Sequence, residues 1–150
     1  MTDRFFEDIK LGEIWESDPY EVTEDEIIAY SRLYDPQPMH TDPVAAASGP
    51  HGSVIASGLH IAALSLKLFV ESGGYGETPV MGLGLDDLRW RRHVHPGDVL
   101  VVRREAVELR RSRSNPLNGL VRTLITVTNQ HGTVVLTMYG SGLVKARTKG

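Results

Sequence analysis

The segment from Gly58 to about Ser72 constrains the fold more than any other part of this 150-residue chain. Its apolar residues recur at the spacing of one helix face, and the residues between them make nearly the whole circumference apolar. A helix of this kind is one that other elements enclose. The glycines that follow Ser72 end it. We therefore predict a buried helix, which the rest of the chain must cover.

The second half of the chain has the pattern of strands that could provide this cover. Four segments are rich in Val, Leu, Thr and Ile, and short turns such as Pro96-Gly97 separate them. Together with an early strand near Ile14 to Val22, they predict about five strands in one long antiparallel meander around the helix. We expect one α+β domain over residues 1–150, without internal repeats. The four predicted strands are Gly82 to Val94, Asp98 to Leu109, Gly119 to Thr128 and Thr133 to Lys145.

Short helices are predicted before the apolar segment. One covers about Glu24 to Leu33 and stops at Asp35, because the following Pro36 disfavours a helical conformation there. A second helical turn runs to Ala47. The start signals are Thr23 with Glu26 for the first helix, and Thr41 or Asp42 with Pro43 for the second.

The composition limits the chemistry of the chain. It has no cysteine, which excludes disulfides, thiolate metal sites, iron–sulfur clusters and a cysteine nucleophile. The net charge of −3 argues against nucleic acid as the main partner. This average hides an acidic first third, and eight arginines lie between Arg89 and Arg113. Those arginines either carry solvated charge on strand exteriors or meet an anionic ligand such as phosphate.

The segment around Asp35 and His40 carries the clearest chemical signal. Pro36 and Pro38 lie between the two residues and restrict the backbone, so that the side chains hold a fixed relation at low entropic cost. A carboxylate and an imidazole held close together form a general acid/base pair that can deprotonate a water near neutral pH. The alternative is a proline-stiffened loop in which Asp35 caps a turn and His40 lies on the surface.

This segment resembles the hydratase signature of the MaoC-like dehydratase family, to which (R)-specific enoyl-CoA hydratases belong. In the signature an Asp is followed by a variable residue, an Asn, a Pro, a variable residue and a His. Asp35, Pro38 and His40 match it, while Gln37 replaces the Asn and Tyr34 replaces the usual preceding Gly. The resemblance extends along most of the chain, through Ile55 to His60, Leu88 to Asp98 and Asn129 to Gly132.

The resemblance implies a hot dog fold, in which an antiparallel sheet wraps a long helix. It also implies reversible syn addition of water to a trans-2-enoyl-CoA thioester. His40 would take a proton from the water, Asp35 would deliver one to the α carbon, and the Gly58 N–H would bind the thioester oxygen at a helix start. It implies no metal and no cofactor. Candidate substrate-binding residues are Gln37, Pro38, Ser57, Leu59 and His60.

Two other functions remain open from the sequence. A hot dog thioesterase would bind acyl-CoA at the same helix end but hydrolyse the thioester, and a non-catalytic module would bind acyl-CoA only. His60 either lines the acyl pocket or has a partner in the core. His93 and His95, with His40 or His51, could be imagined as a metal site, but no acidic ligand follows at a suitable spacing.

The expected partners follow from the same features. The most apolar stretch, Val54 to Val70, is shorter than the ~20 residues that span a bilayer, and the acidic N-terminus lacks the pattern of a signal peptide. We therefore expect a cytoplasmic protein without a membrane or nucleic-acid partner. Arginines between Arg89 and Arg113 are candidates for contacts with CoA phosphates. A thin shell around one helix cannot readily enclose a CoA thioester, so we expect a homodimer or an assembly of dimers.

Overall fold

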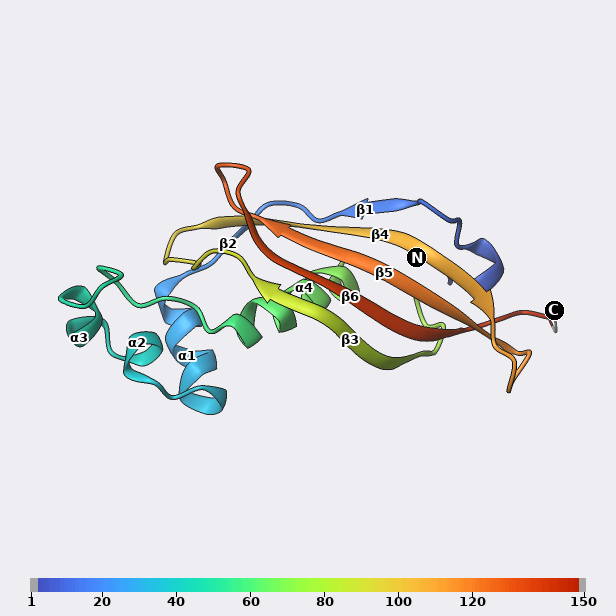
Figure 1. Ribbon diagram of the computed structural model, residues 1–150, viewed down its shortest axis with the longest axis horizontal. Coiled ribbons are helices and arrows are strands. Elements are labelled where there is room, and N and C mark those ends of the chain that lie inside the picture. The colour runs from blue at the N-terminus through green and yellow to red at the C-terminus, as the bar shows by residue number, and fades with distance from the viewer. Residues whose placement is uncertain (1–2, 149–150) are drawn as a thin grey trace.

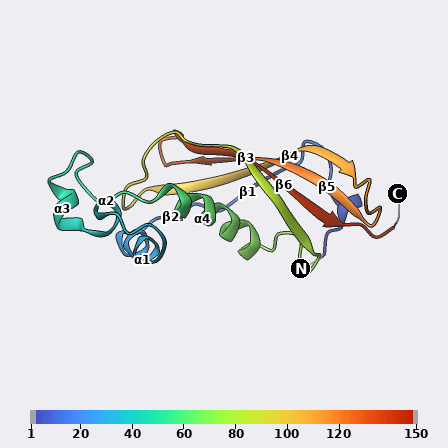
Figure 2. The same cartoon turned by 60° about the horizontal axis from the view of Figure 1, so that its bottom comes forward.

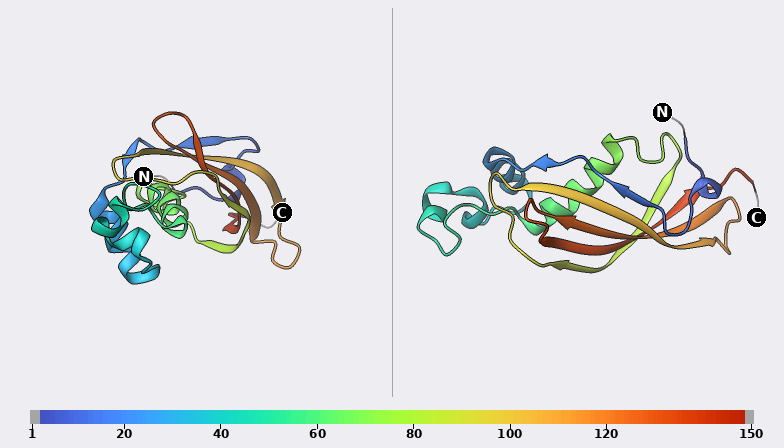
Figure 3. Two further views of the ribbon diagram at one scale, coloured as in Figure 1. Left: turned by 60° about the vertical axis from the view of Figure 1, so that its left-hand side comes forward. Right: turned by 90° about the horizontal axis from the view of Figure 1, so that it is seen from above.

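A computed structural model of the chain describes residues 3–148. One curved antiparallel sheet runs along the molecule, and helix α4 (Gly58–Glu71) lies against its concave face, as the end-on view in Figure 3 shows. The helix and the sheet around it agree with the architecture predicted from the sequence. The strands are β1 (Ile14–Glu16), β2 (Tyr20–Glu21), β3 (Val80–Trp90), β4 (Val99–Arg111), β5 (Asn118–Thr128) and β6 (Val134–Lys145).

Six strands are present among the described residues, where about five were predicted. The difference lies in the early strand, which is two short strands, β1 and β2, that both pair with β4. Ser17 still bonds to Val102 between them through its backbone N–H and its hydroxyl. Pro19, however, has no N–H with which to continue the ladder.

The prediction of one continuous meander is wrong for β3. The order along the sheet is β1-β4-β5-β6-β3, so β3 pairs with β6 and forms an edge, although β4 follows it in the chain (Figure 1). β3 also ends at Trp90, earlier than the predicted Val94, because the chain then crosses the end of the sheet. In this crossing the Arg91 N–H donates to the Val135 carbonyl, and the Val94 carbonyl accepts from the Ala56 N–H. His93 and His95 therefore lie on a connection and not on a strand.

The core lies between the inner face of the sheet and one face of α4. Ile61 and Leu64 of the helix are buried there, and β5 alternates strictly between buried and half-buried residues. The opposite face of α4 is open, since Leu59, Leu66 and Val70 are each more than half exposed. The predicted enclosure of α4 is thus only partial within one chain. The largest fully buried apolar side chains are Ile27, Leu100 and Leu136.

The other three α-helices within residues 3–148 come before α4 in the chain and gather at one end of the sheet, as Figure 2 shows. In α1 (Glu24–Tyr34) the Thr23 hydroxyl caps the first turn by accepting from the Glu26 N–H, but the Glu26 carboxylate turns away from the cap. A short helix that was not predicted, α2 (Pro38–Thr41), holds His40. In α3 (Pro43–Ala47) the cap is Asp42, whose carboxylate accepts two backbone N–H groups.

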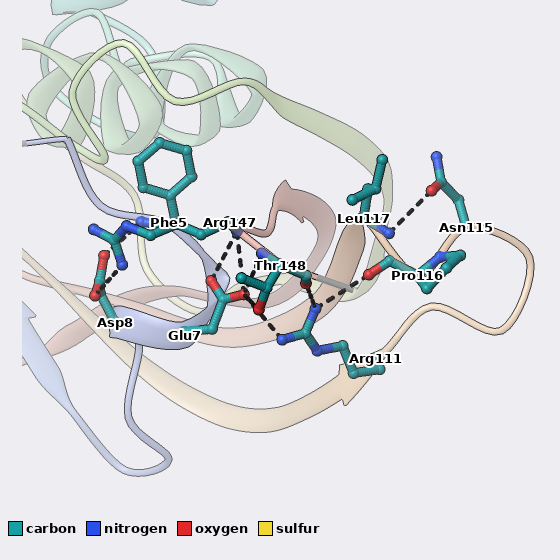
Figure 4. A network of polar contacts seen from close by, with 9 residues as sticks. All are labelled: Phe5, Glu7, Asp8, Arg111, Asn115, Pro116, Leu117, Arg147 and Thr148. Atoms are coloured by element: carbon teal, nitrogen blue, oxygen red, sulfur yellow. Dashed lines mark hydrogen bonds and ion pairs between the residues drawn. The ribbon is translucent and has the colours of Figure 1, made fainter. Parts of the chain in front are cut away.

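At the opposite end of the molecule, Glu7 of the 3-10 helix η1 (Phe6–Asp8) ties the two terminal segments together (Figure 4). Its carboxylate accepts hydrogen bonds from the backbone N–H groups of Arg147 and Thr148 and from the Arg111 guanidinium at 2.9 Å. Asp8 pairs with the Arg147 guanidinium at 2.7 Å. These donors, led by the Arg147 N–H, lower the pKa of Glu7 to about 2.

This shift predicts that acid releases the C-terminal segment. Because the folded pKa lies below the unfolded value of about 4.5, Glu7 stabilises the folded state above pH 4.5, and this contribution is lost as the pH falls toward 2. Hydrogen exchange at the Arg147 and Thr148 amides should accelerate over that interval, relative to the intrinsic rate. In Glu7→Gln, exchange should already be fast at pH 6. Equal protection in this variant and the wild type would contradict the assignment.

Candidate active site

Asp35 and His40, the predicted acid/base pair, face each other across the junction of α1 and α2. Asp35 is the C-cap of α1, and His40 is the third residue of α2. The distance from His40 Nε2 to Asp35 Oδ2 is 3.3 Å. The alternative that placed His40 on the surface is wrong, because the residue is only 4% exposed.

One hydrogen bond decides which ring nitrogen of His40 is basic. Nδ1 lies 2.6 Å from the backbone carbonyl oxygen of Ile55, and a carbonyl can only accept, so Nδ1 carries the proton. In the neutral imidazole the lone pair is therefore on Nε2, the nitrogen that faces Asp35. The Ile55 N–H in turn donates to the carbonyl of Met39, which joins the two segments in both directions.

Asp35 is held as a carboxylate. The Gln37 amide donates to its Oδ1 at 2.7 Å, and this bond, together with the Ser57 hydroxyl and the neighbouring His40, lowers the pKa of Asp35. Asp35 is thus ionised at neutral pH. Gln37, which replaces the Asn of the hydratase signature, supplies the main stabilising contact.

A pocket of about 340 Å³ opens over this pair. It lies at the start of α4, and its wall is mostly apolar. Of the eight residues proposed from the sequence, Pro38 and His60 do not line it. Pro38 instead forms the first turn of α2. The predicted residues that do line the pocket are Asp35, Gln37, His40, Ser57, Gly58 and Leu59.

Gly58 begins α4 at the wall of the pocket, where the first N–H groups of a helix have no partner within the helix. A side chain at this position would force Trp90 or the helix start to move, because a Cβ would overlap the indole ring of Trp90. The glycine thus allows Trp90 to lie directly against the helix start. Both residues shape the pocket, and the positive end of the helix dipole points into the same region.

Comparison with known proteins places this chain in a family. The family model described as the MaoC-like domain matches residues 10–129. The chain belongs to the family of MaoC-like domains.

Solved structures agree with this placement. A MaoC-like dehydratase from Rhodospirillum rubrum is 31% identical, with a TM-score of 0.84, over 97% of this chain and 99% of that one. A monoamine oxidase regulatory protein from Archaeoglobus fulgius is 29% identical, with a TM-score of 0.86, over 99% and 98%. The (R)-hydratase PhaJ1 of Pseudomonas aeruginosa is 25% identical, with a TM-score of 0.80, over 95% and 86%. The MaoC-like domain therefore has the hot dog fold.

The pocket of this MaoC-like domain also contains residues that the sequence did not single out, Met39 and Trp90, and residues for which it suggested other roles. Arg92 was among the candidates for CoA phosphates, and His93 was considered as a metal ligand. All four line the pocket together with the predicted residues. Trp90 lies within a segment that resembles the family, but its position in the sequence did not predict contact with Gly58. Burial, with a contribution from His51 and other histidines, lowers the pKa of His93, which favours its neutral form. Among residues 3–148, no group of three or more His, Asp or Glu side chains could hold a metal ion.

His60 is a core residue, as one of the two sequence interpretations held. It is 5% exposed, and its Nε2 lies 2.7 Å from Glu26 Oε2, where it donates to the carboxylate. Its ring stacks on Tyr30 with centroids 4.6 Å apart. Glu26 also accepts a hydrogen bond from Tyr20. These contacts fasten α1 to α4, and thereby the helix that ends at Asp35 to the helix that starts at Gly58.

The eight arginines between Arg89 and Arg113 do not form one patch. Arg92 alone among them lines the pocket. Arg89, Arg103 and Arg111 form ion pairs with Asp87, Glu105 and Glu7, respectively. Arg104 points toward the inside of the sheet. No helix within residues 3–148 has the length and apolar character needed to cross a membrane.

Proposed function

We propose that this MaoC-like domain catalyses the reversible hydration of a trans-2-enoyl-CoA to the (3R)-3-hydroxyacyl-CoA. The observation that carries the proposal is the pair formed by a buried His40, with its lone pair on Nε2, and an ionised Asp35 3.3 Å away. The two groups lie in one pocket with the unpaired N–H groups at the start of α4. A base, a second proton carrier and an oxyanion donor are the groups that hydration of a conjugated thioester requires.

The protons balance with one water and no further reagent. As the water oxygen bonds to the β carbon, His40 Nε2 removes one of its protons and becomes an imidazolium. That proton passes to Asp35 across the 3.3 Å contact, and Asp35 delivers it to the α carbon. Both groups then return to their starting states. Because both act from one side of the bound substrate, the hydroxyl and the hydrogen add to the same face of the double bond.

Negative charge collects on the thioester oxygen while the new bond forms. We assign its stabilisation to the Gly58 N–H, because the first turn of α4 combines an unpaired donor with the positive end of the helix dipole. Ser57 is buried directly before Gly58 and contributes its hydroxyl to Asp35. Ser57 and Gly58 thus place the proposed oxyanion donor next to the acid/base pair. The likeness to an (R)-hydratase at 25% identity supports the proposed reaction.

Crotonyl-CoA provides the direct test. We expect the enoyl absorbance to decrease without release of free thiol, and a chiral assay should identify the (3R)-hydroxy product. Release of thiol would identify a thioesterase instead. Binding of acyl-CoA without any turnover would identify a non-catalytic binding module.

The open edge of the sheet supports a second part of the proposal, a homodimer. β3 is the edge strand next to β6, and most of its residues are exposed. Apolar side chains continue from this edge onto the exposed face of α4, and such a surface is typical of an interface between chains. The exposed apolar residues are Val80, Met81, Leu83, Leu85, Leu66 and Val70.

A charge placed on this edge should therefore separate the dimer. Leu83 on β3 is 52% exposed, so Leu83→Asp costs little within one chain but places a charge in the proposed interface. Sedimentation equilibrium should give a dimer for the wild type and a monomer for Leu83→Asp. Leu11→Asp is the matched control, because Leu11 is 68% exposed and lies away from β3. A monomeric wild type would refute the proposal.

A further inference from the structure

A second cavity lies beyond the active-site pocket, between the sheet and the side of α4 that carries the exposed residues Leu66 and Val70. Its mouth belongs to the surface proposed above as the dimer interface, so a second copy of the chain would close the cavity on that side. Its volume is about 570 Å³, within the range of small-molecule sites and larger than the pocket over Asp35 and His40. Gly82 and Gly84 of β3 leave room in its wall, since a Cβ at either position would meet no atom within 4 Å. The wall is mainly apolar and includes Ala62, Leu66, Val70, Ile125, Met138 and Val144.

One charged side chain interrupts this apolar wall. Arg104 lies on the inward side of β4, in the alternation that places the buried residues Val102 and Ala106 on the same face. It lines the cavity, and its guanidinium lies over the ring of Phe69, 4.2 Å from the centroid. An apolar residue is the ordinary choice at such a position.

The charge of Arg104 is not neutralised within the part of the chain that the structure describes. No carboxylate between residues 3 and 148 forms an ion pair with Arg104, and Tyr75, which also lines the cavity, lies close enough to affect its pKa. Burial lowers the pKa of Arg104, so its charge carries a desolvation cost. The adjacent Arg103, on the outer face of the same strand, pairs with Glu105 at 3.1 Å. Of these two neighbouring arginines, the one without an ion pair, Arg104, is thus the one that faces the inner cavity.

We infer that this cavity binds an aliphatic chain that ends in a carboxylate, and that Arg104 holds the carboxylate. The apolar wall removes the chain from water, and the planar guanidinium offers two parallel donors to the two carboxylate oxygens. Tyr75 lies beside the same guanidinium and adds a hydroxyl group to this end of the cavity.

The cavity and the active-site pocket lie along the same helix. On α4, Ile61 lines the first pocket and Ala62 the second cavity. Phe69, beneath Arg104, follows Gly58 by eleven residues, which is about 16 Å along the helix axis. A long acyl chain in an extended conformation spans this distance. The ligand is therefore either an acyl substrate with a carboxylate at its far end, an interpretation that rests on the proposed function, or a free fatty acid.

Calorimetric titration of the wild-type chain with decanoate and with decan-1-ol tests the inference directly, without turnover. We expect decanoate to bind at least about tenfold more tightly than the alcohol, as a charge-assisted contact implies. In Arg104→Met this preference should disappear, because affinity for decanoate decreases while affinity for the alcohol is kept. Arg103→Met is the matched control and should behave as the wild type. Absence of decanoate binding to the wild type, or an unchanged preference in Arg104→Met, would overturn the inference.

Enzyme kinetics then distinguish the two ligand sources. If the carboxylate belongs to the substrate, trans-2-enoyl-CoA with a terminal carboxylate should have a KM at least about tenfold lower than the matched unsubstituted thioester, and Arg104→Met should remove the difference. If the ligand is a free fatty acid, both thioesters should have the same KM, and decanoate should still bind in an Arg104-dependent way. A chain without hydratase activity would refute the proposed function, while the decanoate titration would still decide the role of Arg104.

Discussion

Replacement of His40 by asparagine is expected to lower the rate of enoyl-CoA hydration by at least about hundredfold with the fold intact. The asparagine amide can still donate to the Ile55 carbonyl in place of Nδ1, so no buried carbonyl loses its partner. The group that is lost is Nε2, the base that faces Asp35. Asp35→Asn removes the other member of the pair and should cause a loss of similar size. Steady-state kcat/KM for hydration and thermal unfolding measure the two effects separately.

A nearby acid provides the control for this experiment. Asp42→Asn alters a carboxylate two residues after His40, but asparagine caps a helix as well as aspartate does, so activity should be unchanged. The double variant Asp35→Asn/His40→Asn should be hardly slower than either single variant, because one proton path needs both groups. Retention of more than a tenth of the wild-type rate in either single variant would exclude that residue from the proposed chemistry.

Gly58→Ala is expected to lower both stability and activity. The new methyl group would overlap the Trp90 indole, so the ring or the helix start must move, and overpacking of this kind costs about 1–3 kcal/mol. Alanine keeps the backbone N–H, so the loss of rate measures displacement of the donor and of the pocket wall. We expect a decrease in kcat of about tenfold or more, because oxyanion stabilisation depends on donor position.

Removal of the obstructing ring tests this explanation. In Gly58→Ala/Trp90→Ala the methyl group has room, and the double variant should be more stable than the sum of the two single changes implies. Unfolding in denaturant and the hydration rate measure the cycle. Additive effects, or a Gly58→Ala variant as stable and active as the wild type, would show that contact with Trp90 does not determine the residue at position 58.

Local patterns were sufficient to predict much of the fold. The 3.6-residue period of apolar side chains predicts α4 with its start at Gly58, and the strand pattern predicts β4 to β6 within a few residues. The prolines between Asp35 and His40 indicated a fixed relation between them, and the structure brings the two side chains to 3.3 Å. These features depend on residues close together in the sequence. The local sequence is therefore enough to predict them.

The sequence by itself determined the types of element, the α4 helix and the candidate acid/base pair. Only the tertiary structure decided that β3 pairs with β6, that Glu26 meets His60, that Trp90 covers Gly58 and that Arg104 faces a cavity. Each of these contacts joins residues far apart in the chain. The helix period and the strand propensity of a segment indicate which of its faces is apolar. They carry no information about which distant segment packs against that face.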